Sequence, residues 1–103
     1  MSVAAGAQVS EVTLVGVVKD PSGAVVVGAH VSLTNTDTRI VRYSDSNEAG
    51  VYDFTSISPG NYELAVERSG FRRKTISSID LRVGESTRRD VALDWSFALL
   101  GVG

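Results

Sequence analysis

The strongest constraint on the fold of this chain is the alternation of apolar and polar side chains at every second residue. It is clearest where Tyr62, Leu64 and Val66 alternate with charged or small residues, and it recurs over 14–18 and 29–34. Successive side chains of an extended strand point to opposite faces, so this period gathers the apolar residues on one face. The pattern therefore predicts a chain built mostly of half-buried β-strands.

Turn sequences separate these segments at short intervals. The runs Asp20–Gly23 and Ser58–Gly60 combine proline, which restricts φ, with glycine, which accepts a positive φ. The run Asn47–Gly50 lies between two stretches rich in β-branched and aromatic residues and predicts a hairpin. Gly50 and Gly60 are expected in turns, at least one of them with a positive φ. Seven short strands joined in this way indicate an antiparallel β-sandwich, because a sheet with one apolar face must bury it against another.

The shared phase of the apolar residues also predicts the core. One irregularity falls between Ile76 and Ile79, which are an odd number of residues apart, and a β-bulge near Ser77 and Ser78 would keep both facing inward. By the same alternation His30 should face outward. The residues expected to be buried are Leu14, Val18, Val31, Leu33, Tyr52, Phe54, Tyr62, Leu64, Val66, Leu81, Val91 and Leu93.

Composition limits the class of protein. The chain has 103 residues with a formal net charge of -2, which suits one globular domain and lacks the basic excess of a nucleic-acid-binding protein. It contains no cysteine, so disulfides, thiolate nucleophiles and iron–sulfur clusters are excluded. No apolar run approaches the roughly 20 residues of a membrane-spanning helix. We therefore expect no membrane span and no nucleic-acid partner.

Three segments are expected along the chain. Residues 1–10 predict a flexible N-terminus, in which Ala5-Gly6-Ala7 fits the A-x-A cleavage pattern of a secretion signal, although an ordinary terminus of small residues would look the same. Residues 11–95 form the predicted sandwich. Residues 96–103 are expected to be a C-terminal tail or the start of a truncated following region.

The turns and strands occur in an order that resembles the carboxypeptidase regulatory-like domain family. Five short motifs carry the resemblance, and together they are more specific than any of them alone: Gly16–Gly23, Gly28–Leu33, Asn47–Phe54, Ser58–Leu64 and Gly70–Phe71. The resemblance implies a prealbumin-like (transthyretin-like) sandwich of seven strands with Greek-key, immunoglobulin-like architecture. It also implies a domain with no catalytic residues and no cofactor.

Two short motifs resemble one particular group of proteins within this family. The Asp-Pro-Ser-Gly turn at Asp20–Gly23 and the Gly-Phe-Arg-Arg sequence at Gly70–Arg73 are similar to the N-terminal extension of TonB-dependent outer-membrane receptors. This resemblance implies export to the periplasm or outer membrane of a Gram-negative-type bacterium. The leading hypothesis is a non-catalytic accessory domain of the cell envelope, an interaction or spacer module of such a transporter. The alternative is a carbohydrate-binding module on the same sandwich.

Candidate catalytic and metal sites are weak in this sequence. His30 is the single histidine, so a Ser–His–acid arrangement or the several metal ligands of a ring-cleaving dioxygenase are not expected. The loop Asp45–Gly50 resembles the start of a calcium loop, but Ala49 stands at a ligand position and a later glutamate is replaced by Ser56. Lys19 falls on the outward phase of its strand and predicts a surface lysine rather than an isopeptide bond. We predict no catalytic, cofactor-binding or metal-binding residue.

A basic region remains as the candidate contact for a partner. Between residues 68 and 89 there are seven Lys or Arg residues against two acidic ones. If the last two strands pair, Arg72, Arg73, Arg88 and Arg89 share one edge and could bind an acidic protein, an envelope glycan or a lipid headgroup. The alternative is edge charge that prevents aggregation. Exposed aromatic residues such as Tyr43 and Trp95 could stack on a sugar, but packing in the core or against the C-terminus suits both better.

Overall fold

The structure is a computed structural model that describes residues 11–83 and 86–96, and these contain eight β-strands and no helix. It follows that the described residues include no helix that could cross a membrane. The expected all-β sandwich is confirmed, with one strand more than predicted, because the short β7 was not recognised. The strands are β1 (Val12–Lys19), β2 (His30–Asn35), β3 (Val41–Asp45), β4 (Val51–Ile57), β5 (Gly60–Glu67), β6 (Lys74–Leu81), β7 (Ser86–Arg88) and β8 (Val91–Ala92).

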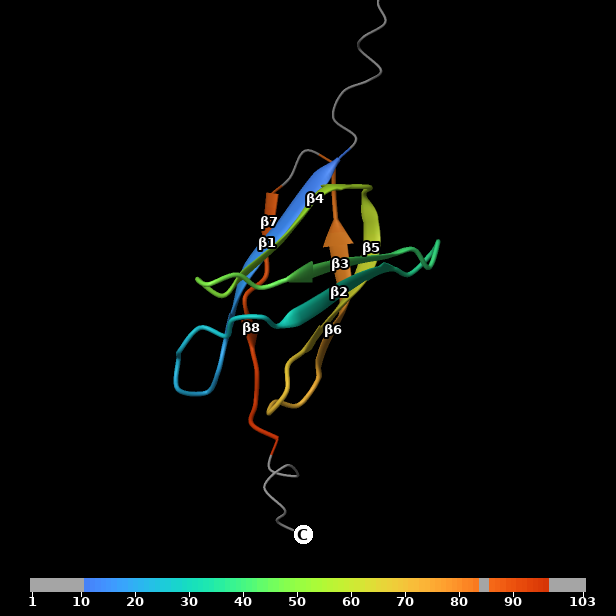
Figure 1. Cartoon of the computed structure of the whole chain (residues 1–103). Helices are drawn as coiled ribbons and strands as arrows, with labels where there is room; N and C mark the ends of the chain where they lie inside the picture. Colours follow the sequence, from blue (N-terminus) through green and yellow to red (C-terminus); the bar gives the residue numbers. More distant parts are fainter. Residues whose placement is uncertain (1–10, 84–85, 97–103) are drawn as a thin grey trace, which may run out of the picture.

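The strands form two sheets that pack face to face (Figure 1). The first has the order β4-β1-β7, with β8 also pairing with β1, and the second has the order β3-β2-β5-β6. Pairing is antiparallel except that β7 and β8 run parallel to β1. The chain reaches β7 from β6 of the other sheet, and a crossover of this kind, unlike a tight hairpin, can deliver a strand in the parallel direction.

The predicted hairpin around Asn47–Gly50 is wrong. β3 pairs with β2, whereas β4 pairs with β1 in the other sheet. The turn itself forms as its residues suggest, since the Asn47 side-chain oxygen accepts the backbone N–H groups of Ala49 and Val51. These local preferences specify a chain reversal but not which strands become neighbours, and here the turn carries the chain from one sheet to the other.

All twelve predicted core residues are buried, with side chains from both sheets meeting between the layers. The predicted bulge is confirmed as well, because Tyr62 pairs with Ile79 and Leu64 with Ile76, so β6 has one residue more than β5 over this stretch. Ser78 has φ 62° at this position.

Gly50 and Gly60 both have positive φ, of 77° and 153°, as expected. Gly50 lies in the predicted turn, whereas Gly60 is the first residue of β5 and not a turn residue. A side chain at Gly50 would meet Val25 at 2.7 Å, so space as well as backbone conformation requires glycine there.

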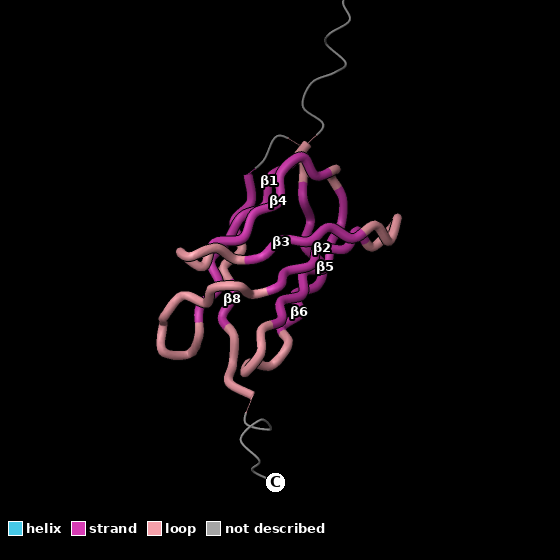
Figure 2. Tube along the Cα trace, viewed as in Figure 1, coloured by secondary structure: helices cyan, strands magenta, loops and turns pink. Residues whose placement is uncertain are grey.

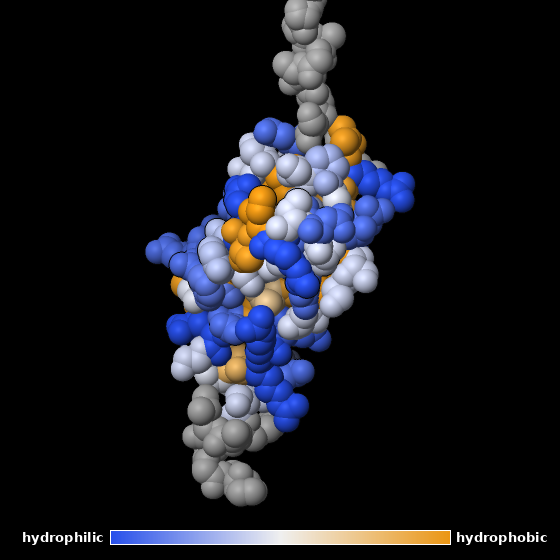
Figure 3. All heavy atoms as spheres, turned by 90° about the vertical axis from the view of Figure 1, so that its right-hand side faces the viewer, coloured by the Kyte–Doolittle hydropathy of each residue, from blue (hydrophilic) through white to orange (hydrophobic). Residues whose placement is uncertain are grey.

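The polypeptide enters and leaves the sandwich at opposite ends. β1 begins at one end of the layers, and the chain that follows β8 leaves at the other end (Figures 1 and 2). The expected N-terminal segment 1–10, the turn at Gly84 and Glu85, and residues 97–103 of the expected C-terminal segment lie outside the described residues. On the face turned to the viewer in Figure 3 the surface is mainly hydrophilic, with small separate hydrophobic patches.

Candidate functional site

The outward side chains of β3, β2 and β5, hereafter the outer face, are the most distinctive surface of the molecule. Strand alternation turns Val31, Leu33 and Leu64 into the core, so the residues between them point outward. The register then aligns these outward residues across the three strands. Two neighbouring rows result, Asp45–His30–Glu67 and Tyr43–Ser32–Ala65.

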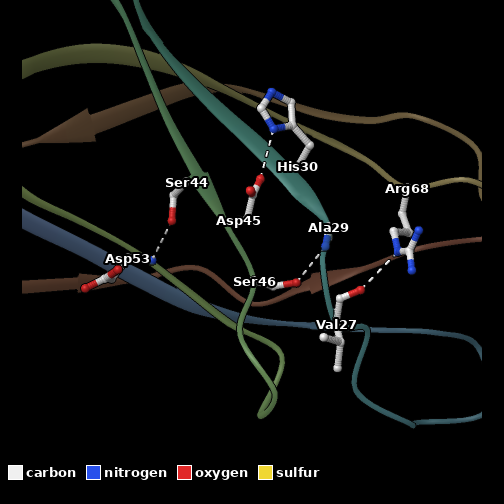
Figure 4. Close-up of polar contacts among 8 residues, drawn as sticks. All are labelled: Val27, Ala29, His30, Ser44, Asp45, Ser46, Asp53 and Arg68. Carbon is white, nitrogen blue, oxygen red and sulfur yellow. Dashed lines mark hydrogen bonds and ion pairs between the residues drawn. The ribbon is translucent and has the colours of Figure 1, made fainter.

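Two aromatic rings stand next to each other on this face. His30 and Tyr43 stack with ring centroids 5.3 Å apart and planes 18° from parallel. Tyr43 is 64% exposed, so the stack leaves most of its ring in solvent. The Nδ1 atom of His30 lies 3.0 Å from Oδ1 of Asp45, and Figure 4 shows these two side chains pointing toward each other from β2 and β3. The expected outward position of His30 is confirmed.

A shallow depression of about 290 Å³ lies beside these rings. Its floor includes Ala65, which points outward yet is only 6% exposed. The larger side chains around this alanine account for its burial. A second shallow depression, of about 440 Å³, adjoins the first and shares His30, Glu67 and Arg73 with it. The first depression is lined by His30, Ser32, Thr34, Val41, Tyr43, Ala65, Glu67 and Arg73.

The charged side chains of the depression are bonded to each other. Arg73 donates a hydrogen bond from Nη1 to Oε2 of Glu67, and both side chains are about half exposed. A pair as exposed as this adds little to stability, because water screens the attraction. Its carboxylate and guanidinium neutralise one another at the wall of the depression.

The His30 ring of the outer face is hydrogen-bonded to the Asp45 carboxylate. Within the described residues no Ser or Thr hydroxyl is hydrogen-bonded to the His30 ring, so no activated nucleophile is formed there. The same part of the chain holds no group of three His, Asp or Glu side chains placed to bind a metal ion. The face offers two stacked aromatic rings, several hydroxyl groups, the Arg73–Glu67 ion pair and the hydrogen-bonded pair of His30 and Asp45.

The loop that resembles a calcium site has a structural role. Ser46 is buried, donates from its hydroxyl to the carbonyl of Val26 at 2.7 Å, and accepts the backbone N–H of Ala29 at 2.8 Å. Figure 4 shows Ser46 and Ala29 in contact between the green and teal segments. Sequence reasoning missed this serine, because nothing in its local sequence distinguishes it from an exposed turn residue.

The four arginines of the predicted basic edge do not share one edge. β6 pairs with β5 in one sheet, whereas β7 pairs with β1 in the other. Arg72 and Arg73 precede β6, whereas Arg88 and Arg89 lie at the end of β7. A contact between these arginines and an acidic partner stays a prediction, now for two separate clusters.

Both clusters include an arginine bonded to an acid. Arg73 pairs with Glu67, and Arg88 Nε lies 3.0 Å from Asp90 Oδ1. Asp90 also accepts the backbone N–H of Val17. The Arg88 hydrogen bond and then this backbone bond hold the pKa of the Asp90 carboxyl below its usual value.

The structure confirms the expectations for Lys19 and Trp95 but not the one for Tyr43. Lys19 is exposed, as predicted for a surface lysine. Trp95 packs against Phe71 with ring centroids 5.0 Å apart, which joins the C-terminal segment to the β5–β6 connection and confirms its packing role. The same expectation for Tyr43 is wrong, because it occupies the outward phase of an edge strand.

Solved structures share this fold at low sequence identity. Hydroxyquinol 1,2-dioxygenase from Pseudomonas putida is 9% identical, with a TM-score of 0.67 over 86% of this chain and 58% of its own. The TIE protein of Bacillus anthracis is 14% identical, with a TM-score of 0.67 over 84% of this chain and 16% of its own. A candidate carbohydrate-binding protein from Bacteroides uniformis is 15% identical, with a TM-score of 0.65 over 80% of this chain and 40% of its own. The present chain thus spans less than two thirds of each, and at these identities the likeness shows the fold alone.

The family is established by sequence. A search of curated proteins found no match. The family model of the carboxypeptidase regulatory-like domain, in contrast, matches residues 13–94, which include every strand except the first residue of β1. This match covers most of the chain and agrees with the observed sandwich. The chain therefore belongs to the carboxypeptidase regulatory-like domain family.

Proposed function

We propose that this chain is a non-catalytic accessory domain of an exported cell-envelope protein, acting as an interaction and spacer element of a TonB-dependent outer-membrane transporter. The carboxypeptidase regulatory-like domain family is non-catalytic, which favours binding over chemistry. The motifs at Asp20–Gly23 and Gly70–Arg73 support the transporter context through their resemblance to the N-terminal extension of such receptors.

The observation that carries the spacer role is the position of the two ends of the fold. The chain enters at β1 and leaves beyond β8 at opposite ends of the sandwich (Figure 1). A domain with this geometry stands in series between the segments before and after it. It therefore sets a distance between them, while its outer faces stay free for contact with a partner.

The genomic context tests this proposal directly. We expect the coding sequence to carry a secretion signal before this domain and a plug and barrel after it, and the full-length product to fractionate with the outer membrane. Removing residues 11–96 in frame should leave the barrel inserted but change partner-dependent uptake. A parent protein retained in the cytoplasm, or one without a barrel, would contradict the transporter assignment.

Carbohydrate binding is a second candidate function, favoured by a specific feature of the outer face. The exposed ring of Tyr43, stacked on His30 beside a depression with hydroxyl groups, is the kind of platform on which a sugar ring packs. The candidate carbohydrate-binding protein of similar fold agrees with this function without establishing it. Binding of glycans to the purified domain, followed by calorimetry, provides the test.

A further inference from the structure

We propose that the depression on the outer face binds an uncharged sugar ring, which packs on the open side of Tyr43 and hydrogen-bonds to the side chains around it. This inference rests on the proposed role of the chain as a non-catalytic binding domain. It specifies the class of ligand and the residues that select it.

The aromatic ring is prepared for such a contact. His30 covers one side of the Tyr43 ring, and the hydrogen bond that Asp45 accepts from His30 limits the rotation of the imidazole. The ring of Tyr43 nevertheless stays mostly exposed, and its neighbours in the depression include the short side chains of Ser32, Thr34 and Val41. A flat apolar surface held in place in this way binds the apolar side of a pyranose ring at low entropic cost.

The polar groups around the ring match hydroxyl groups. Ser32 and Thr34 can each donate and accept a hydrogen bond, the Glu67 carboxylate accepts, and the Arg73 guanidinium donates. Sugar hydroxyls have the same double capacity. An aliphatic or purely aromatic ligand would instead leave these polar groups without partners, which costs free energy where water is displaced.

Charge selects a neutral ligand. The depression is lined by the carboxylate of Glu67 and the guanidinium of Arg73, which form an ion pair with each other. An anionic sugar would therefore meet a guanidinium already neutralised by a carboxylate. A cationic sugar would meet a carboxylate already neutralised by the guanidinium. An uncharged sugar needs no counter-charge and can hydrogen-bond to the pair without breaking it.

The size of the depression also favours a small ligand over a protein. Its volume of about 290 Å³ lies at the lower limit of small-molecule sites, which suits roughly one or two sugar rings. A stable protein interface buries about 800 Å² on each partner and needs a larger continuous apolar centre. Protein binding at this face is therefore the alternative outcome of the test.

The experiment uses the 103-residue chain and an array of immobilised oligosaccharides in three chemical classes: neutral hexoses, N-acetylhexosamines and uronic acids. We expect binding within the two uncharged classes and none to the uronic acids. The best oligosaccharide from the array is then titrated by calorimetry against the wild type and the variants below.

Four variants separate the contributions of the aromatic ring, the ion pair and the rest of the surface. Tyr43→Ala should weaken binding about tenfold or more, the equivalent of roughly 1.4 kcal/mol, whereas Tyr43→Phe keeps the ring and should bind within about twofold of wild type. Glu67→Gln removes the partner of Arg73 and should add measurable affinity for the uronic acid class. Val83→Ala removes an exposed apolar side chain outside the depression and should leave binding unchanged. The melting temperatures of all these variants should match that of the wild type, because the substituted side chains are exposed.

Absence of binding to every uncharged oligosaccharide would overturn the inference, as would equal binding by wild type and Tyr43→Ala. Preference of the wild type for uronic acids would contradict the charge argument, and saturable binding of a protein displaced by Tyr43→Ala would replace the sugar with a protein partner. Each of these results leaves the genomic test of the transporter role unaffected. Conversely, a parent protein without a barrel would leave a positive sugar titration valid.

Discussion

At the scale of single residues, a very close fit joins Gly16, Tyr52 and Arg89. A Cβ atom at Gly16 would lie 1.8 Å from the carbonyl oxygen of Arg89 and 2.7 Å from the Tyr52 ring, so glycine is required by space alone. The same carbonyl accepts the Tyr52 hydroxyl at 2.5 Å. Through these contacts β1, β4 and the segment that joins β7 to β8 are held together.

Tyr52→Phe tests the hydrogen bond in this fit. The ring stays buried and only the hydroxyl is lost, so we expect the free energy of unfolding to fall by about 0.5–1.5 kcal/mol. Urea melts provide the measurement, with the exposed Tyr43→Phe as the matched control that should not change. Equal stability of the two variants would show that the Tyr52 hydroxyl contributes nothing to the fold.

Tyr52 also predicts how stability depends on alkaline pH. Burial, and then the negative charge of Asp90, raise the pKa of the Tyr52 hydroxyl above its ordinary value of about 10. Because the folded state favours the protonated hydroxyl, its contribution is complete below the unfolded pKa and declines as pH rises above about 10. Melts from pH 8 to pH 11 should show a steeper alkaline loss for wild type than for Tyr52→Phe. Parallel curves would argue against the shift.

Ser46→Ala tests the buried serine between β3 and the segment before β2. The change removes a donor from the carbonyl of Val26 and an acceptor from the N–H of Ala29, both in a water-poor position. Unpaired buried groups of this kind cost about 1–3 kcal/mol, and we expect a loss in that range in chemical denaturation. Ser69→Ala is the control, because Ser69 is exposed. A loss no larger than that of the control would mean that water replaces both bonds.

At the scale of elements, β3 of one sheet covers the open edge of β4 in the other sheet. The side chains of Arg42 and Ser44 point inward from β3, since they pair across the strand with the buried Leu33 and Val31. They reach the backbone of β4, where Arg42 Nη2 donates to the Thr55 carbonyl at 3.1 Å. β3 thereby covers backbone groups of β4 that another strand could otherwise pair with.

The double variant Arg42→Ala with Ser44→Ala should expose that edge. The Ser44 hydroxyl accepts the N–H of Asp53 at 3.4 Å, so both changes free backbone groups of β4. We expect concentration-dependent self-association in sedimentation velocity, because an uncovered edge pairs with other chains. Arg39→Ala removes an equal charge from the neighbouring loop and should stay in the wild-type state. A double variant that sediments like wild type would show that β4 is protected by something else.

At the scale of the whole molecule, the distribution of arginine predicts two independent contacts rather than one. Two double variants test this: Arg72 and Arg73 changed to Gln, and Arg88 and Arg89 changed to Gln. Each should weaken binding to lipopolysaccharide and reduce its salt dependence, because exposed charges are screened within about 10 Å at 0.1 M salt. Arg72 and Arg89 should account for most of the loss, because Arg73 and Arg88 are each paired with an acid. The two losses should add, since the clusters belong to different sheets. Equal affinity of wild type and the four-fold variant at two salt concentrations would reduce both clusters to protection against aggregation.

The sequence by itself determined which side chains face inward. Leu33, Leu64 and Val66 alternate with polar residues, and any extended strand must place such a set on one face. The sequence also predicted a positive φ for at least one of Gly50 and Gly60, and the bulge at Ser78. Turn chemistry and a break in the alternation are likewise local properties of the chain.

Only the tertiary structure decided which strands are neighbours. β3 and β4 follow one another in sequence with a well-formed turn between them and still join different sheets, and β7 pairs in parallel with the first strand of the chain. The stack of His30 on Tyr43, the pairing of Arg73 with Glu67 and the separation of the arginine clusters all depend on those pairings. Alternation is a local property of each strand. It sets the face on which each residue lies but carries no information about which strand lies beside it.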